Sequence, residues 1–177
     1  HRPARGVRRG AGATTRLNVT VARLRSVQAF VTGDVARPGS YQISAAGTAL
    51  SALYAAGGPT ENGSFRHVEI LPGGLLLHSL DLYDYLLRGD NNRDARLENG
   101  DVIFVPVRGT QAKVTGAIIR PAIYELKPTE SLRDLLQSAG GFEATALRRR
   151  VQVDRILPPA QRAPGGRDRV VLEIGAD

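Results

Sequence analysis

The 177-residue chain has no cysteine and no tryptophan, and aromatic residues make up only 5% of it. Without cysteine, the chain cannot form disulfides, thiol nucleophiles or thiolate metal sites. The few aromatic residues offer no evident platform for stacking bases or sugar rings. No run of 18 apolar residues occurs, so we predict no membrane-spanning helix. A hydrophobic content of 42% is nevertheless ordinary for a globular protein and sufficient to form a core.

Acidic residues are absent from the first 33 positions, and this region carries the whole excess of positive charge. The formal net charge is +7, and seven arginines precede Asp34, which leaves 17 basic and 17 acidic residues in the remainder. We therefore expect a flexible basic leader over residues 1–16, followed by a charge-balanced body. Nucleic-acid binding through the leader is an alternative, and salt would weaken such binding steeply. The balanced body argues against it, and we expect no nucleic-acid partner.

The body contains an internal repeat with a constant offset of 83 residues. Identical residues recur in three clusters that all keep this offset. The matching segments are Val31–Tyr41 and Val114–Tyr124, Ala56–Gly58 and Ala139–Gly141, and Arg66-x-Val68 and Arg149-x-Val151. Three clusters in one register indicate that a structural unit has been duplicated.

Each copy has the pattern of a β-hairpin followed by a helix. In the first copy, Val31–Val35 and Tyr41–Ile43 are expected strands, joined by a turn at Arg37-Pro38-Gly39. Thr48 is expected to cap a helix that ends at Gly57-Gly58. Three side chains of this helix are expected to face the core: Leu50, Leu53 and Tyr54.

The second copy repeats this logic. Ser131 is expected to cap its helix, and Gly140-Gly141 to end it. The apolar stripe of this helix consists of Leu132, Leu135 and Leu136. The remaining expected strands are Val68–Leu71, Leu75–Leu80, Val102–Val107, Val151–Ile156 and Val170–Ile174, with a short helix at Asp81–Leu87 and a tight turn at Glu98–Asp101. This order predicts an α+β fold of two tandem β-grasp-like units, each a small mixed sheet with one crossing helix.

The expected organisation is a leader and two units. The first unit covers residues 17–108, including a preceding strand with alternating apolar residues at Leu17–Val21, and the second covers residues 112–177. The second unit has no counterpart of the closing strand, so we expect it to be truncated or completed from elsewhere. The chain begins with His1 and has no apolar segment behind its first basic residues. We therefore expect a piece of a longer protein, without a signal peptide.

These motifs resemble a known domain. Val-x-Gly-x-Val-x-Arg-Pro-Gly-x-Tyr at 31–41, Ala-Gly-Gly at 56–58 and Asn-Gly-Asp-x-Ile-x-Val-Pro at 99–106 are similar to the SLBB domain, the soluble-ligand-binding β-grasp. Tandem copies resemble the bacterial polysaccharide biosynthesis/export family, through which capsule or exopolysaccharide leaves the cell. The second copy departs from the pattern at Ala122, where the turn glycine is expected.

The resemblance implies a non-enzymatic periplasmic module of an outer-membrane polysaccharide export protein. Such a module would act in oligomer assembly and in glycan contact. Its implied partners are further copies of itself, a polysaccharide, and the inner-membrane synthesis and co-polymerase machinery. The alternative is a soluble receptor for a small ligand or saccharide, which predicts a closed pocket between the units.

Arginines and one tyrosine are the candidate residues for contact with a glycan or a neighbouring subunit. They are Arg37, Arg120, Arg148, Arg149, Arg150 and Tyr83. Arginine forks match carboxylates, although turn formation alone also explains the two Arg-Pro pairs, and a solvated loop end explains the arginine run. We expect no catalytic residue, cofactor or metal. A calcium-like spacing around Asp90–Asp101 has Ala95 where the loop requires glycine.

Overall fold

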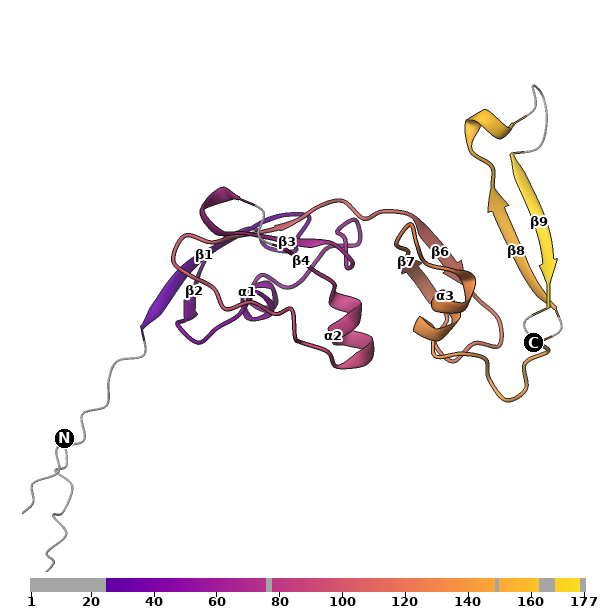
Figure 1. Ribbon diagram of the computed structural model, residues 1–177, viewed down its shortest axis with the longest axis horizontal. Helices are drawn as coiled ribbons and strands as arrows, with labels where there is room; N and C mark the ends of the chain where they lie inside the picture. Colours follow the sequence, from indigo (N-terminus) through magenta and orange to yellow (C-terminus); the bar gives the residue numbers. More distant parts are fainter. Residues whose placement is uncertain (1–24, 76–77, 149, 163–167, 176–177) are drawn as a thin grey trace, which may run out of the picture.

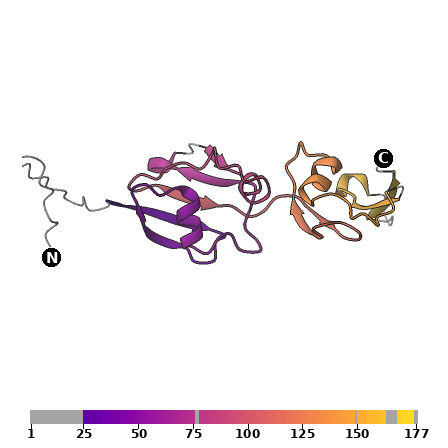
Figure 2. The same cartoon turned by 90° about the horizontal axis from the view of Figure 1, so that it is seen from below.

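The computed structural model describes residues 25–75, 78–148, 150–162 and 168–175 (Figure 1). The expected leader and the expected strand at Leu17–Val21 lie outside these residues. The described part contains two units that follow one another along the long axis of the molecule (Figures 1 and 2). The first described residues lie at the outer end of the first unit, and the last two strands lie at the far end of the second unit (Figure 1).

The first unit is built on a five-stranded mixed sheet. Its strands are β1 (Ser26–Gly33), β2 (Gly39–Ser44), β3 (Val68–Leu71), β4 (His78–Leu80) and β5 (Val102–Val105). They lie in the order β2-β1-β5-β3-β4. The central strand β5 runs parallel to β1 and antiparallel to β3, and the outer pairs are antiparallel. The adjacent strands β1 and β5 therefore come from opposite ends of the unit's sequence.

Two seven-residue helices accompany this sheet. Helix α1 (Ala49–Ala55) begins after Thr48, whose amide donates to Ser51 Oγ at 3.3 Å in a capping box. Helix α2 (Leu82–Arg88) begins after Asp81, whose carboxylate accepts from the amide of Tyr83. A 3-10 turn at Pro72–Gly74 leads from β3 toward β4. Both caps satisfy helix amides that would otherwise lack a partner.

A single apolar core lies between the sheet and α1. Its fully enclosed side chains come from the central strands and include Val31, Val68, Ile70, Ile103 and Val105. Burial of such side chains is the main favourable term in folding. The prediction that Leu50 and Leu53 face this core is confirmed.

Three details of the predicted elements were wrong. Tyr54 is 68% exposed, because the residue after Leu53 lies about 100° further round the helix and off its apolar stripe. The strand predicted from Leu75 begins only at His78, and Leu75 is exposed. Strand β5 ends at Val105, where Pro106 has no amide hydrogen to continue the ladder.

The second unit repeats the order hairpin, helix, hairpin, and within the described residues it has no counterpart of α2 or β5. Its strands are β6 (Gln111–Val114), β7 (Ala122–Glu125), β8 (Val151–Ile156) and β9 (Arg169–Ile174), with α3 (Leu132–Ser138) after β7 and a 3-10 turn at Pro159–Gln161. The strands pair as two separate antiparallel hairpins, β6–β7 and β8–β9. A small core joins the first hairpin to α3: Val114, Ile118, Tyr124, Leu135 and Ala139. The α+β class predicted for both units is confirmed.

Candidate functional site

The repeated Arg-Pro turns contact the ends of the helices in the same way in both units. The Arg37 amide donates to Ala56 O at 3.0 Å, and the Arg120 amide donates to Ala139 O at 3.0 Å. Tyr41 Oη donates to Arg37 O at 2.6 Å, as does Tyr124 Oη to Arg120 O at 2.7 Å. Of the residues that recur at the 83-residue offset, the arginine and tyrosine of the hairpin and the alanine at the helix end therefore attach the turn to the helix C-terminus.

The two arginine side chains lie over the glycines that end these helices. Arg37 Nη2 donates to Ala55 O at 3.0 Å, and a Cβ at Gly140 would approach Arg120 Nε to 3.2 Å. Gly57 and Gly140 have φ of 85° and 83°, a left-handed conformation in which glycine has no steric penalty. Turn formation thus explains this repeated motif, and both guanidinium groups remain exposed at the surface.

The arginine run leads into the β8–β9 hairpin. Arg150 Nη2 forms an ion pair with Glu173 at 2.9 Å, and both side chains are more than half exposed. The Arg148 guanidinium lies 6.0 Å from the centre of the Phe142 ring. Arg149 lies outside the described residues. An ion pair this exposed contributes only about 0–1 kcal/mol to stability.

A buried ionic cluster joins the two units, and sequence reasoning missed it. Arg66 of the first unit is 6% exposed. Its Nε donates to Asp81 at 3.0 Å, its Nη2 pairs with Glu130 of the second unit, and its Nη1 donates to Glu125 O at 3.3 Å. The guanidinium also lies 4.5 Å from the centre of the Tyr83 ring, a cation–π arrangement.

The carboxylate of Glu125 makes the converse contact from the second unit. It is 8% exposed and accepts three hydrogen bonds: from Ser64 Oγ at 2.8 Å, the Phe65 amide at 2.8 Å and the Gly109 amide at 2.7 Å. A buried carboxylate is tolerated when its oxygens are satisfied in this way. Glu125 therefore holds the loop before β3, the linker and β7 together.

Two further side chains complete this contact. Lys127 Nζ pairs with Asp81 at 2.5 Å, and Tyr83 Oη accepts from the Glu125 amide at 3.0 Å. Tyr83 also meets Tyr124 edge to face, with ring centres 6.2 Å apart. We call this set the junction cluster; it consists of Ser64, Arg66, Asp81, Tyr83, Glu125, Lys127 and Glu130. Tyr83, a predicted contact residue, is half-buried within it.

Comparison with known proteins places both units in one family. Two SLBB domain models match the chain, one over residues 27–105 and the other over residues 111–172. The chain belongs to the SLBB domain family. Two relatives from Escherichia coli, both named polysialic acid transport protein KpsD, are 29% identical over 146 residues. The resemblance to polysaccharide export proteins with tandem SLBB domains is thereby confirmed.

The matched region covers 78% of this chain but only 26% of each KpsD protein. The chain therefore spans about a quarter of the length of these relatives. Tandem SLBB domains and this similarity support a polysaccharide export-related module. The names of these relatives describe transport. No helix within the described ranges is both long and apolar enough to cross a bilayer.

The protonation of the junction between the SLBB domains follows from its contacts. Burial alone would lower the pKa of Arg66, but the hydrogen bond that Arg66 donates to Glu130 and the charges of Asp81 and Glu130 raise this pKa above its ordinary value. Burial raises the pKa of Tyr83. The guanidinium is therefore charged and the phenol neutral at physiological pH. Among the described residues, every buried side-chain polar atom has a hydrogen-bond partner.

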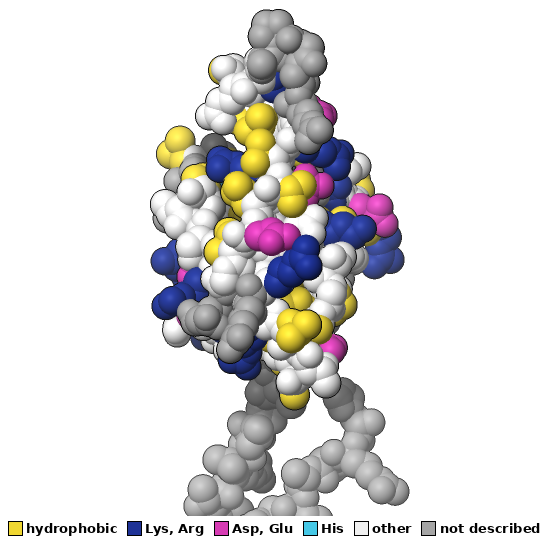
Figure 3. Space-filling model, turned by 90° about the vertical axis from the view of Figure 1, so that its right-hand side faces the viewer, with side chains coloured by type: hydrophobic (Ala, Val, Ile, Leu, Met, Phe, Trp, Pro, Cys, Tyr) yellow, Lys and Arg dark blue, Asp and Glu magenta, His cyan; other side chains and the backbone are white. Residues whose placement is uncertain are grey.

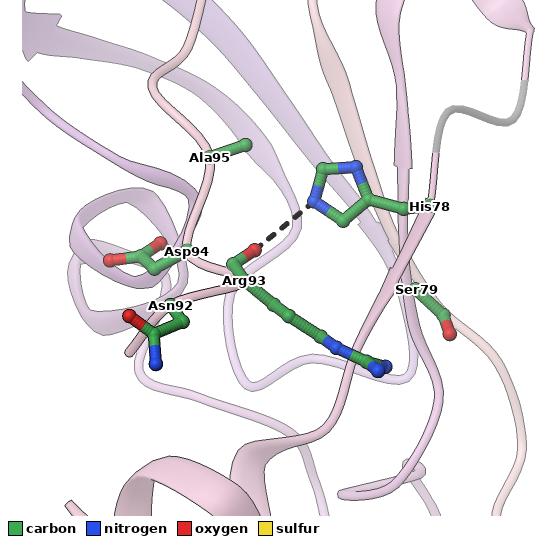
Figure 4. Close-up of a pocket in the computed structure, with 6 residues that line it drawn as sticks. All are labelled: His78, Ser79, Asn92, Arg93, Asp94 and Ala95. Atoms are coloured by element: carbon green, nitrogen blue, oxygen red, sulfur yellow. Dashed lines mark hydrogen bonds between the residues drawn. The ribbon is translucent and has the colours of Figure 1, made fainter. Parts of the chain in front are cut away.

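The first SLBB domain also has an open polar pocket of about 520 Å³ between β4 and the loop after α2 (Figure 4). Its lining residues are His78, Ser79, Asn92, Arg93, Asp94 and Ala95. His78 Nε2 lies 3.1 Å from Arg93 O, and Asp94 accepts from the Leu50 amide at the start of α1. The Asp94 carboxylate thus satisfies an amide in the first turn of α1. No group of three His, Asp or Glu side chains in the described part of the chain is placed to hold a metal.

An apolar groove of about 230 Å³ lies between α1 and α2 of the same domain. Tyr54 and Leu86 form its exposed rim. The small-ligand alternative predicts a pocket between the two units. Both of these hollows are lined instead by the first domain, while the junction cluster occupies the contact between domains.

Proposed function

We propose that the chain is a non-enzymatic periplasmic module of an outer-membrane export protein for capsule or exopolysaccharide. In this role its SLBB units, residues 17–108 and 112–177, act together as one rigid piece that assembles with copies of itself. The observation that carries the proposal is the junction cluster between tandem SLBB domains. Similarity to a polysialic acid transport protein supports the polysaccharide as cargo.

The junction suits a scaffold better than a hinge. Inter-domain contacts that must move are expected to be polar, hydrated and weakly held. Here Arg66 and Glu125 are each less than 10% exposed, and both reach across the junction. Separation of the domains would break the ion pair of Arg66 with Glu130 and the hydrogen bonds that Glu125 accepts from Ser64 and Phe65. The relative orientation of the domains is thus set before any assembly takes place.

The same proposal assigns contacts to the candidate arginines. Arg37, Arg120, Arg148, Arg149 and Arg150, together with the accessible edge of Tyr83, would meet a glycan or a neighbouring subunit. Arginine offers paired donors to carboxylates of either partner. The inner-membrane synthesis and co-polymerase machinery would deliver the polysaccharide, so no catalytic group is required of this module.

Export by cells that carry the full-length protein tests the proposal. Arg66→Leu should reduce the polysaccharide at the cell surface while the protein is still found at the outer membrane by immunoblotting of fractions. The matched control is Arg88→Leu, which removes an exposed arginine paired with Asp84. Equal export by both variants at equal protein levels would refute a role for the rigid junction. A readily isolated monomeric full-length protein that exports normally would refute the assembly role.

A further inference from the structure

The sheet of the first SLBB domain has one face that packs against helices and another that no α-helix of the described residues covers. Successive side chains of a strand point to opposite faces of its sheet. Val31 of β1 and Ile103 of β5 point into the core, to which α1 and α2 both contribute residues. Their neighbours Phe30 and Phe104 therefore point to the other face. These two residues are 38% and 37% exposed.

The register of β1 and β5 brings the two phenylalanines together. Phe30 lies opposite Val102, and Thr32 lies opposite Phe104, so the two aromatic rings are diagonal neighbours on one face. Diagonal neighbours in a sheet lie roughly 7–8 Å apart. Two of the chain's four phenylalanines thus share a surface. The composition offered no evident stacking platform, because this arrangement depends on pairing between strands that lie far apart along the chain.

Uncharged polar side chains surround the two phenylalanines. We call this surface the open face; its residues are Gln28, Phe30, Thr32, Ser40, Gln42 and Phe104. Among the outward-facing residues of the five strands only Glu69 is charged, and its carboxylate lies 3.2 Å from His67 Nε2. Charged residues make up 23% of the whole chain, so this lack of charge is a local property. Figure 3, which views the β8–β9 end of the molecule, shows basic and acidic side chains among hydrophobic ones.

The chemistry of the open face matches a sugar ring better than other partners. The C–H groups of a pyranose ring pack against aromatic rings, whose faces carry partial negative charge. Its hydroxyl groups can pair with the glutamine amides and with the serine and threonine hydroxyls, which both donate and accept. An apolar partner would bury these polar groups without hydrogen bonds, which is unfavourable. A nucleic acid needs lysine or arginine for its phosphates, and the open face has neither.

We propose that the open face binds an uncharged stretch of a polysaccharide, with one sugar ring on Phe30 and a second on Phe104. Strand pairing holds both side chains in place before the glycan arrives, which lowers the entropic cost of binding. The site belongs to the first domain, because Lys113 and Ile123 stand at the positions of Phe30 and Ser40 in the second copy. This inference rests on the proposed function, whose glycan contact it assigns to a defined surface.

Titration of two uncharged hexasaccharides, cellohexaose and chitohexaose, onto the isotope-labelled 177-residue chain tests the site by NMR. At least one of them should shift amide signals of β1, β2 and β5. A double variant, Phe30→Leu with Phe104→Leu, keeps apolar side chains on both strands and should bind at least about tenfold more weakly, because it lacks the aromatic faces. Tyr54→Leu is the matched control, since it removes an aromatic ring that is 68% exposed on α1. This control should bind as tightly as the unsubstituted chain.

Several outcomes would overturn the proposal. One is that neither hexasaccharide binds, and another is that the double variant binds as tightly as the unsubstituted chain while its core amide signals show that it is folded. Tighter binding of hexagalacturonate or of a thymidine oligonucleotide at the same amides would assign the open face to an acidic glycan or a nucleic acid. Self-association through these amides that the double variant retains would make the face a contact between copies.

The full-length protein separates a failure of this inference from a failure of the proposed function. If no hexasaccharide binds, but export still depends on Arg66 and not on Arg88, only the sugar site is refuted. If the hexasaccharides bind at the open face, but Arg66→Leu and Arg88→Leu export equally, the sugar site stands and the role of the rigid junction is refuted.

Discussion

Ser64 Oγ donates a 2.8 Å hydrogen bond to the carboxylate of Glu125, and this bond links the two SLBB domains. Ser64 is 1% exposed, and its hydroxyl oxygen also accepts from the amides of Arg66 and His67. One hydroxyl therefore orders the loop before β3 and positions the side chains that reach into the second domain. The stability of each domain is consequently coupled to the presence of the other.

Replacement of Arg66 should be the most damaging single change at the junction. Arg66→Leu leaves Asp81 and Glu130 without their guanidinium partner, so the free energy of unfolding should fall by about 3–5 kcal/mol. Urea denaturation should also change from one transition to two, as the domains lose their coupling. Arg88→Leu is the matched control and should cost less than about 1 kcal/mol. A single unshifted transition in the Arg66 variant would contradict this prediction.

A double-mutant cycle should detect the contact between Ser64 and Glu125. Ser64→Ala and Glu125→Gln should each lower the free energy of unfolding by about 1–3 kcal/mol. Their effects should be non-additive, with a coupling energy of roughly 0.5–3 kcal/mol. The exposed pair Arg150 and Glu173, each changed to alanine, provides the comparison cycle. Its coupling energy should not exceed about 1 kcal/mol.

The repeated tyrosines should contribute equally to their domains. Tyr41→Phe and Tyr124→Phe each remove a hydroxyl that donates to an arginine carbonyl, so each should cost about 0.5–1.5 kcal/mol of unfolding free energy. Tyr54→Phe removes a hydroxyl that is largely exposed and should have no measurable effect. Thermal denaturation of the three variants measures this. A cost at only one of the two repeated positions would argue against their equivalence.

Acid should weaken the start of helix α3. Hydrogen bonds from the Ser131 hydroxyl and the Ser131 amide lower the pKa of Asp134 below its ordinary value of 3.8. A depressed pKa in the folded state means that this stabilisation is present above pH 3.8 and is lost as the pH falls through the folded value. Asp134→Asn should remove this pH dependence, which NMR titration of the α3 amides would follow. An unchanged acid titration in the Asn variant would contradict the assignment.

Local features of the fold were predictable because they depend on neighbouring residues. Thr48 and Ser131 both cap the helices predicted for them, since a short hydroxyl side chain before an apolar stripe satisfies the first helix amides. The hairpin of the second copy keeps its register although Ala122 replaces glycine: Val114 pairs with Ala122 as Val31 pairs with Gly39. The prediction that Tyr54 faces the core was wrong, because a residue at the edge of the apolar stripe can point toward the core or toward solvent without changing the local sequence pattern.

The junction cluster could not be predicted, because its members lie far apart along the chain. Arg66 and Glu130 are separated by 64 residues, and Ser64 and Glu125 by 61. The Arg66-x-Val68 repeat includes Arg66, but a repeat does not indicate which residues form ion pairs with its arginine. Only the packing of the loop before β3 against β7 reveals which of the many charged residues are buried together.

The amino-acid sequence was sufficient to establish a duplicated α+β unit, its helix caps and its turns, because each of these depends on residues within one hairpin or helix. Folding in three dimensions determined the rest. It buried Arg66 and Glu125 in a shared cluster, since charges leave water only when partners from both domains meet them.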